Sequence, residues 1–434
     1  MHRSIVLSLL TAAASVVSAC QDVPDAVTQA AAGLAASASS DNEGAVHFAG
    51  FTPLTASAVC TVSGGDPANP LLLPAGFTQS IVASEPDIIT NGDMQAWNES
   101  GPEVGRFLDR THETGPNTGL SVTDLVTGSS HMLVRRQDWS SLDGLIWTPW
   151  GTLLFAEEQA NTSTNPDPDF PQAIAGLVYE LNPATLQVAA RPALGSKSHE
   201  GQAMDRNGNH YGISEKAGGA LFKFVPDLPG DYSAGQLYAF KLSTDLGDRT
   251  GPGTWVALDR TASRIDADAE AGVKLATGYG RPEDLEHWVS PNGTREVIYA
   301  ALTSENRIIA LDITDPANPV VTTVVQQGIN APADFIFPDN LAFDRFGNLF
   351  VTEDPGGSFP GKTQGDDIWM ATLGTDPAGL AASFTRFASI NDCDAEPTGI
   401  LFDKSGKRLF VDIQHRGGDG LDKTVAISRT PGKP

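Results

Sequence analysis

The sequence predicts an all-β protein, a β-propeller of about six blades with loop insertions. The chain holds 44 Gly and 29 Pro in 434 residues, a composition that favours many short elements joined by turns over long helices. Beyond residue 65, short apolar runs alternate with turn signals. Five of these turns share one pattern, which indicates a repeat architecture.

Each of the five turns places a glycine between two predicted strands. Tight hairpin turns need backbone conformations that glycine adopts easily. The five segments are TPWGTLLFAEE (148–158), DRNGNHYGISE (205–215), SPNGTREVIYA (290–300), DRFGNLFVTED (344–354) and DKSGKRLFVDI (403–413).

The spacing of these glycines suits propeller blades. Subtraction of successive positions, 151, 208, 293, 347 and 406, gives steps of 57, 85, 54 and 59 residues. A four-stranded blade occupies about 40 to 50 residues, so each step fits one blade with a decorated loop, and the longest holds an insertion. We expect strands from both ends of the chain to complete one blade. A β-sandwich or a solenoid is the competing architecture, but sandwiches rarely repeat one hairpin so evenly.

The N-terminal residues 1–19 are typical of an export signal. His2 and Arg3 precede an apolar stretch too short to span a bilayer, and small residues follow. The run Val-Ser-Ala-Cys at 17–20 resembles the lipobox of bacterial lipoproteins, which would attach acyl chains to Cys20. The alternative is a plain secretory signal. We expect a periplasmic or outer-membrane lipoprotein, or a secreted protein.

Residues 20–65 are predicted to be a tether, and residues 66–434 the propeller domain. The tether contains few large apolar side chains, so it cannot bury enough surface to offset ordering. Cys60 and Cys393 remain as an even number of cysteines in an oxidising compartment. A disulfide between them is plausible, and two buried free thiols are the alternative.

The charge balance bears on partners. The chain has 28 Lys and Arg against 53 Asp and Glu, a net charge of −25. This argues against nucleic acid as a partner, because phosphate backbones are bound by basic surfaces. An acidic excess is compatible with a solvated surface and also with carboxylate cages for hard cations.

Carboxylates recur at fixed distances from the turn glycines. The residues eight positions before the five glycines are Asp143, Glu200, Leu285, Asp339 and Thr398, and three of them are acidic. In the other two repeats a carboxylate is close by: Glu283 and Glu286 near Leu285, and Glu396 near Thr398. Further carboxylates follow the turns: Glu157, Glu158, Glu215, Glu353 and Asp354.

Equivalent repeat positions should converge at one end of the central channel. A ring of buried carboxylates without cations would be strongly destabilising. A set dominated by carboxylate oxygens suits Ca²⁺, Mg²⁺ or Mn²⁺. The alternative for any single residue is a solvated turn or a cap. His199 is expected to orient a neighbouring ligand, and His415 to contact metal or substrate or to fill a hydrogen-bonded structural role.

Several stretches resemble the PhoX-type alkaline phosphatases, an exported bacterial family of calcium-dependent phosphoesterases with a propeller core and an iron–calcium centre. They are LDGLIWTPWGTLLFAEE, SHEGQAMDRNGNHYGISE, YGRPEDLEHW, PDNLAFDRFGNLFVTED and EPTGILFDKSGKRLFVDIQHRGG. Together they cover much of the chain from about residue 75 to 420.

The resemblance implies roles for single residues. The metal-binding carboxylates would be Glu157, Glu200, Glu283, Asp339 and Glu396. Arg281 and Asn340 look like contacts to the substrate phosphate, and His415 falls in the closing motif of the family. Where the family has Cys-Glu-Glu, this sequence has Ala156-Glu157-Glu158. The missing cysteine is an iron ligand in the family, so we expect a carboxylate centre that holds several Ca²⁺ ions, with iron weakened or absent.

The resemblance therefore implies a metal-dependent hydrolase of phosphate esters. Metals would activate a water or oxo group for attack on phosphorus, and Arg281 would bind the phosphate. We expect a monomer that acts on small molecules. Two alternatives stay open at this point: a calcium-dependent lactonase-type propeller hydrolase, and a non-catalytic, calcium-stabilised propeller that serves as a binding module.

Overall fold

The computed structural model describes residues 48, 50–61, 64–162, 166–355, 361–417 and 420–430. The expected signal peptide and Cys20 lie outside these residues. The chain divides into two compact units, 1–45 and 46–434, and every described residue belongs to the second. In the part of the chain that the structure describes, no helix is long and apolar enough to cross a bilayer.

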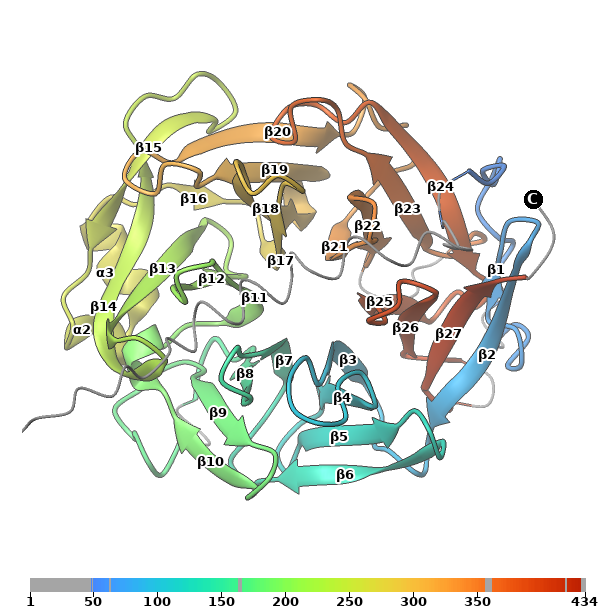
Figure 1. Ribbon diagram of the computed structural model, residues 1–434, viewed down its shortest axis with the longest axis horizontal. Helices are drawn as coiled ribbons and strands as arrows, with labels where there is room; N and C mark the ends of the chain where they lie inside the picture. The colour runs from blue at the N-terminus through green and yellow to red at the C-terminus, as the bar shows by residue number, and fades with distance from the viewer. Residues whose placement is uncertain are drawn as a thin grey trace, which may run out of the picture. The chain divides into compact units, whose positions relative to one another are not determined.

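The strands of this second unit form six antiparallel groups of four that follow one another around a ring (Figure 1). The first three groups are β3 (Gly92–Trp97), β4 (Phe107–His112), β5 (Gly119–Asp124) and β6 (Ser129–Arg135); β7 (Leu142–Trp147), β8 (Leu153–Glu157), β9 (Val178–Asn182) and β10 (Gln187–Ala190); and β11 (His199–Met204), β12 (His210–Ser214), β13 (Gly219–Leu228) and β14 (Asp231–Leu242). The last three are β17 (Pro282–Val289), β18 (Glu296–Leu302), β19 (Arg307–Asp312) and β20 (Val320–Gln326); β21 (Pro338–Phe343), β22 (Asn348–Glu353), β23 (Asp367–Thr372) and β24 (Ser383–Ile390); and β25 (Glu396–Phe402), β26 (Arg408–Gln414), β27 (Lys423–Arg429) and β2 (Phe77–Ser84).

The last group combines both ends of the domain. Strand β2, from the N-terminal side, pairs antiparallel with β27, so the expected completion of one blade by both chain ends is confirmed. The short β1 (Leu71–Leu72) adds a fifth strand beside β24. The predicted all-β propeller is therefore confirmed.

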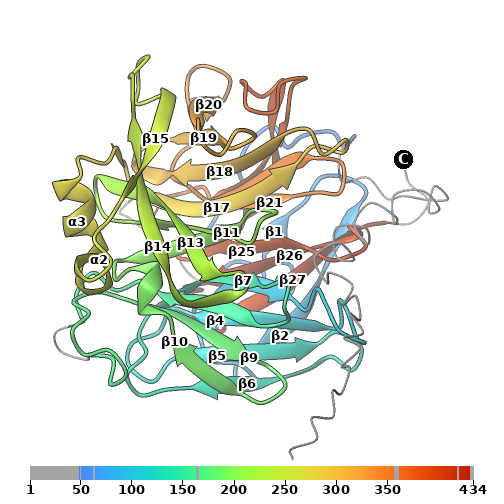
Figure 2. The ribbon, with the colours of Figure 1, turned by 60° about the vertical axis from the view of Figure 1, so that its left-hand side comes forward.

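The longest step of the repeat holds an insertion, as the sequence predicts. It contains β15 (Gly251–Ala257), α2 (Ala262–Ile265), α3 (Ala267–Val273) and β16 (Gly278–Tyr279). Because β15 pairs with both β14 and β20, the third and fourth groups merge into one ten-stranded sheet, and the hydrogen-bonded sheets number five. The two helices lie beside β14 on the outside of the ring (Figure 2). Two 3-10 turns, η2 (Pro192–Leu194) and η3 (Thr303–Glu305), complete the described elements.

The five glycine turns connect the first and second strands of five groups. Each glycine has a positive φ, between 65° and 85°, and each donates its N–H to the carbonyl three residues earlier. A residue with a Cβ would be strained in that conformation, which is why the glycine pattern locates these hairpins.

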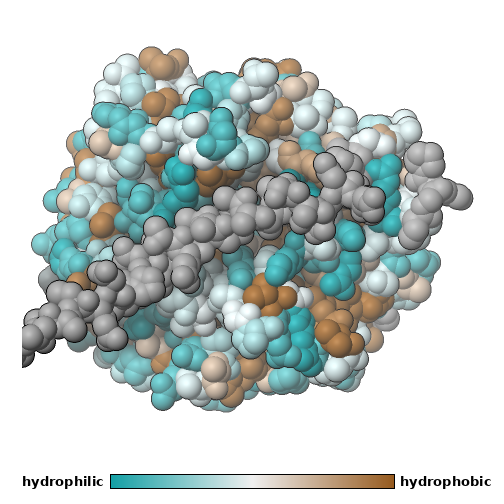
Figure 3. Space-filling view, viewed as in Figure 1, coloured by the Kyte–Doolittle hydropathy of each residue, from teal (hydrophilic) through white to brown (hydrophobic). Residues whose placement is uncertain are grey.

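Buried apolar clusters lie between neighbouring groups. One of them brings Phe350, Phe387 and Phe402 together with Phe48, whose ring centroid is 5.0 Å from that of Phe402. The folded unit thus begins before residue 66, and the expected tether is shorter than 20–65. Figure 3 shows hydrophilic residues over the visible face, with smaller hydrophobic groups among them.

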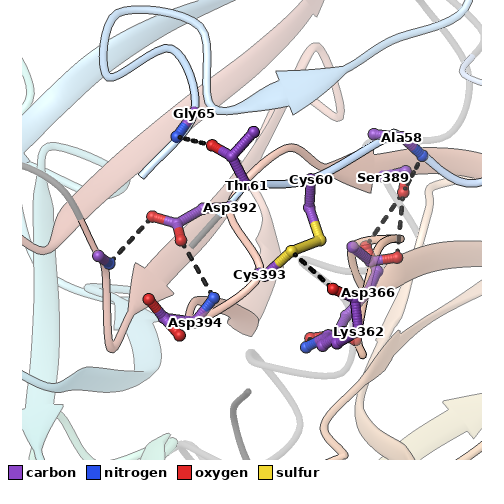
Figure 4. The surroundings of a disulfide bond; sticks show 12 residues. Ala58, Cys60, Thr61, Gly65, Lys362, Asp366, Ser389, Asp392, Cys393 and Asp394 are labelled. Carbon is purple, nitrogen blue, oxygen red and sulfur yellow. Dashed lines mark hydrogen bonds and ion pairs between the residues drawn. A yellow bond between two sulfur atoms is a disulfide. The ribbon is translucent and has the colours of Figure 1, made fainter. Parts of the chain in front are cut away.

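A disulfide joins Cys60 to Cys393, with 5.0 Å between the Cα atoms (Figure 4). The expected pairing is therefore confirmed over two free thiols. Beside it, the Ala58 N–H donates to Ser389 Oγ at 2.8 Å. The bridge fixes the N-terminal segment of the domain to the loop that precedes β25 (Figure 4).

Replacement of both cysteines by alanine is expected to lower the free energy of unfolding by about 2 to 5 kcal/mol, because the bridge closes a long loop in the unfolded chain. Denaturant unfolding of the wild type and of Cys60→Ala/Cys393→Ala measures this. A reductant should destabilise the wild type and leave the double variant unchanged. Equal stability of the oxidised wild type and the variant would contradict the prediction.

Candidate functional site

The first group of candidate residues lies on the innermost strand of each blade. These six strands, β3, β7, β11, β17, β21 and β25, each contact the next, so they form a closed ring. Each has a register shift near its beginning, and such bulges re-aim side chains. At or beside the bulges lie five buried residues, Asp93, Asp143, Glu200, Glu283 and Thr398, and the partly exposed Asp339. Five of the six are carboxylates, as convergence of equivalent repeat positions predicts.

Close approach of neighbouring inner strands depends on small residues beside the bulges. A Cβ at Gly399 would lie 1.9 Å from the backbone oxygen of Asp93, so only glycine fits there. In β17 the residue equivalent to Gly399 is Asp284. Its Oδ1 accepts from Leu285 N at 2.7 Å and its Oδ2 from Leu341 N at 2.8 Å. Asp284 therefore ties β17 to β21.

The second group of candidate residues comes directly after the second strand of each blade. The strands β4, β8, β12, β18, β22 and β26 are followed by Glu113, Glu158, Glu215, Thr303, Asp354 and His415 respectively. Four of these six residues are carboxylates. Because β4, β8 and their counterparts run antiparallel to the inner strands, this group lies at the same end of the ring as the first.

Two sets of three carboxylates could hold a metal ion. In each set one oxygen from every residue lies within 4.8 Å of the others. The sets are Asp93, Glu113 and Asp143, and Glu158, Glu200 and Glu215. Both combine residues from the first and second groups, and Asp143 and Glu200 interact across the two sets, so the carboxylates form one acidic site at one end of the ring of inner strands.

Burial is the largest cause that raises the pKa of Asp93, Asp143, Glu158 and Glu200, and neighbouring carboxylates add to it. The pKa of Asp143 rises to about 7, and that of Glu158 to about 11 through burial and the charges of Glu113 and Glu215. Burial likewise raises the pKa of Glu200, with Asp143 as the strongest neighbouring charge. Ionising the whole site without a cation is therefore unfavourable.

Arg281 is a cation within this acidic wall. Its Nη2 lies 2.7 Å from Glu215 Oε1 and 3.0 Å from Glu283 Oε1, and its side chain is 41% exposed. Burial lowers the pKa of Arg281, but Glu283 and Glu215 outweigh that effect and raise it. Burial raises the pKa of Glu283. The charge of Arg281 lowers it, but by less than burial raises it. The guanidinium is thus held in place by two carboxylates and still reaches solvent.

His415 and Glu396 meet at the neighbouring part of the site. His415 Nε2 lies 3.1 Å from Glu396 Oε1, and the imidazole is 44% exposed. Burial, followed by the hydrogen bond that the protonated Glu396 carboxyl donates to Asp354, raises the pKa of Glu396. By contrast, His199 is buried, with Nε2 3.0 Å from the Gly195 oxygen, so it supports the strand that carries Glu200.

Asn340 is buried beside the bulge of β21. Its Oδ1 accepts from Thr398 Oγ1 at 2.6 Å and from Gly399 N at 2.5 Å, which ties β21 to β25. Its Nδ2 donates to Asp339 Oδ1 at 3.3 Å. The amide nitrogen carries two hydrogens, so it retains a donor for a ligand above Asp339.

Glu157, one of the carboxylates predicted to bind metal, is placed elsewhere. Its Oε1 accepts from Ser140 N at 3.2 Å and its Oε2 from Tyr179 Oη at 2.9 Å. Side chains alternate along a strand, so the next residue, Glu158, points into the acidic site instead. Glu157 is a structural carboxylate, and Glu158 replaces it in the candidate site.

The exchange of these two neighbours for glutamine separates their roles. Glu158→Gln is expected to weaken Ca²⁺ affinity about tenfold or more, because it removes a proposed ligand, and to stabilise the metal-free protein near neutral pH, because it removes a carboxyl group whose pKa is raised. Glu157→Gln is expected to lower the free energy of unfolding by about 1 to 3 kcal/mol, because it disturbs a buried hydrogen-bond network, and to leave Ca²⁺ affinity unchanged. Calorimetric titration and thermal unfolding measure the two effects. The reverse pattern would restore the assignment of Glu157.

Two carboxylates of the site, Asp93 and Glu113, escape the sequence pattern. They belong to the first blade, whose hairpin between β3 and β4 lacks the glycine turn from which positions were counted. The segment GDMQAW around Asp93 nevertheless resembles LDGLIW around Asp143 in its acidic, apolar and tryptophan positions. This similarity between the two segments is the sequence signal from which Asp93 could have been predicted.

The donors fit a hard divalent cation. Both candidate sets consist of carboxylates alone, and oxygen-rich sites of this kind suit Ca²⁺, Mg²⁺ or Mn²⁺. The side chain of Ala156 is a methyl group and offers no ligand atom to a metal. It is buried in an apolar cluster that includes Val178 and Phe222.

Comparisons with known proteins identify the family of the chain. A sequence model of the family described as alkaline phosphatase PhoX matches residues 147–323 and 308–417, which together span more than half of the chain. No curated protein matches the sequence.

One solved structure shares the fold, and others are similar at lower TM-scores. The structure of Pseudomonas fluorescens PhoX in complex with vanadate, a transition state analogue, is similar with a TM-score of 0.65 and 18% identity, over 89% of this chain and 99% of that one. A gluconolactonase from Xanthomonas campestris has a TM-score of 0.42 and 14% identity, over 87% and 98% of the two chains. An auxiliary nutrient binding protein from Bacteroides thetaiotaomicron has a TM-score of 0.46 and 13% identity, over 79% and 69%.

Proposed function

The chain belongs to the alkaline phosphatase PhoX family, and from this membership we propose that it hydrolyses small-molecule phosphate esters with bound Ca²⁺ at the channel end. It is accordingly assigned as a phosphoric ester hydrolase. The observation that carries the proposal is the position of Arg281, a half-exposed guanidinium set among buried carboxylates. A phosphate needs such a donor, and metal ions need such carboxylates.

The residues proposed to hold the ions are the two carboxylate sets, together with Glu283, Asp339 and Glu396. Calcium bound there would polarise phosphoryl oxygens and lower the pKa of a bound water. The nearby carboxylates then stay ionised, because the cation offsets the burial that raises their pKa values.

Arg281 is proposed to bind the substrate phosphate. Its planar fork can donate to two equatorial oxygens, a geometry that lysine cannot reproduce. Glu215 and Glu283 hold the guanidinium in position before substrate arrives. This lowers the cost of ordering the side chain on binding.

Asn340 and His415 are proposed to contact the substrate from the adjoining blades. Asn340 would donate through Nδ2, the atom left available by the bonds that fix its Oδ1. His415 is half-exposed and held through Nε2 by Glu396, so Nδ1 is the ring atom that can face a ligand.

We propose that iron is not held at stoichiometric level, because Ala156 stands where the family has a thiolate. Metal analysis by mass spectrometry tests this together with the activity. Calcium with turnover of p-nitrophenyl phosphate, lost on chelation and restored by Ca²⁺, would support both proposals. Iron at stoichiometric level would overturn the first, and calcium without turnover of any phosphate ester would overturn the second.

The protein is proposed to be exported and to work as a monomer at the periplasm, the outer membrane or outside the cell. The Cys60–Cys393 disulfide supports export, since such bonds persist in oxidising compartments. Cell fractionation of the wild type and of Cys20→Ser tests export and lipidation. Cytoplasmic retention of the wild type would contradict the proposal.

A further inference from the structure

The rim of the acidic site repeats one backbone conformation. Two residues before the inward-facing carboxylate of four blades, φ is positive, with values of 52°, 47°, 47° and 47°. The residues in this position are Asn91, Ser141, Arg281 and Phe337. Arg281 and Phe337 belong to adjacent blades, and they carry the longest side chains of the four.

Phe337 is an unusual residue for that conformation. Left-handed backbone strains a bulky side chain, and such strain persists where the surroundings impose it and often where it serves function. Here the Phe337 N–H donates to Asn306 Oδ1 at 2.9 Å, and its carbonyl accepts from Asp354 N at 2.9 Å. Asparagine or glycine would satisfy both bonds with less strain, so the backbone does not explain the aromatic ring.

The Phe337 ring also lies outside the core. It is 36% exposed, it belongs to none of the buried apolar clusters, and among the described residues it makes no contact with another aromatic ring. About a third of the residue thus stays open to solvent at the rim, where a ligand can reach the ring.

Hydrogen bonds through one residue place Phe337 beside Arg281. The Thr303 N–H donates to the carbonyl of Arg281 at 2.9 Å, and Thr303 Oγ1 donates to the carbonyl of Pro338 at 2.6 Å. Thus the segment that carries the guanidinium and the segment that carries the phenyl ring are tied side by side at the rim.

We propose that Phe337 is a specificity-determining residue that contacts the leaving group of the ester, and that the enzyme favours phosphate esters of aromatic or other planar alcohols. The inference rests on the proposed function. With the phosphate on Arg281, the alcohol part of the ester projects toward the rim, where an exposed ring can stack on a planar group. Such ring pairs contribute about 0.5 to 1.5 kcal/mol of binding free energy in addition to the contribution of the apolar area that they bury.

The test compares phenyl phosphate with glycerol 2-phosphate in the calcium-loaded enzyme. Phe337→Asn, which suits the left-handed backbone, is expected to lower kcat/KM for phenyl phosphate about fivefold, chiefly through KM, and to leave glycerol 2-phosphate unchanged. Phe337→Tyr should keep the preference. Phe346→Asn is the matched control, since Phe346 is 42% exposed but lies in the hairpin at the opposite end of β21.

The outcomes separate the two proposals. If the wild type hydrolyses neither ester, the proposed function fails. If it hydrolyses both and Phe337→Asn changes the two kcat/KM values equally or not at all, the assignment of Phe337 is overturned while the function stands. Circular dichroism and the melting temperature show whether Phe337→Asn is folded. If it is not, loss of the phenyl phosphate preference in folded Phe337→Tyr would overturn the assignment, and retention would support it.

Discussion

Arg281→Ala is expected to lower kcat/KM for p-nitrophenyl phosphate by about 100- to 1,000-fold, the range found when one donor to a developing oxyanion is removed. Arg281 is the guanidinium that the structure places against Glu215 and Glu283 in the acidic site. Its loss removes both the charge and the paired donors from the phosphate. Arg281→Lys should recover only part of the activity, because an ammonium restores the charge and not the fork.

Arg249→Ala is the matched control for this variant. Arg249 is also 41% exposed and also pairs with a carboxylate, Glu305, at 2.7 Å, but it lies on the inserted segment outside the acidic site. Its replacement should leave kcat and KM unchanged. Near wild-type turnover by folded Arg281→Ala would show that the phosphate is bound without Arg281. It would also favour a reaction that depends on the carboxylates and metals alone.

The fold could be predicted from the sequence because its determinants are local. A glycine in a tight hairpin is needed for backbone reasons alone, so five such turns identify five blades before any contact is known. The first blade was not visible in this way, since the connection between β3 and β4 has a different turn. The joining of two blades through β15 depends on pairing between distant strands, which a local pattern cannot specify.

The candidate site could be predicted only in outline. Counting from the turn glycine selects Leu285 in the third repeat, which is the fourth blade, whereas the carboxylate at the equivalent bulge is Glu283. Strand β17 has 8 residues where β7, β11 and β21 have 6, so the count slips by two residues. The choice between Glu157 and Glu158 failed for a related reason, because a shift of one residue turns a strand side chain to the other face. Which of two neighbouring residues faces the site is decided by the side chains that it contacts, and some of these lie on other blades, far away in the sequence.

Removal of bound Ca²⁺ is expected to lower the melting temperature, and to lower it more at pH 8 than at pH 5. The sign follows from the raised pKa values. A carboxyl group whose folded-state pKa exceeds its unfolded value contributes stability that is fully present below the unfolded pKa, near 4, and that is lost as pH rises through the folded pKa. That folded value is about 7 for Asp143 and about 11 for Glu158, and those of Glu200 and Glu283 are also raised.

The metal-free protein should therefore lose stability steadily from about pH 4 to pH 8 and beyond, at about 1.4 kcal/mol for each pKa unit of a single group. Calcium acts in the opposite direction, because it binds ionised carboxylates and must displace protons at low pH. At a free Ca²⁺ concentration of 1,000 times the Kd, binding adds about 4 kcal/mol. The gap between loaded and metal-free protein should thus widen as pH rises.

Scanning calorimetry of metal-free and calcium-loaded protein at the two pH values measures this gap. Glu200→Gln is the informative variant: one raised pKa is removed, so the metal-free protein should depend less on pH, and the effect of added Ca²⁺ should shrink. A melting temperature that does not respond to Ca²⁺ at either pH would contradict the prediction. The acidic ring would then be stabilised by retained protons, and the carboxylates of the channel would be acids rather than ligands.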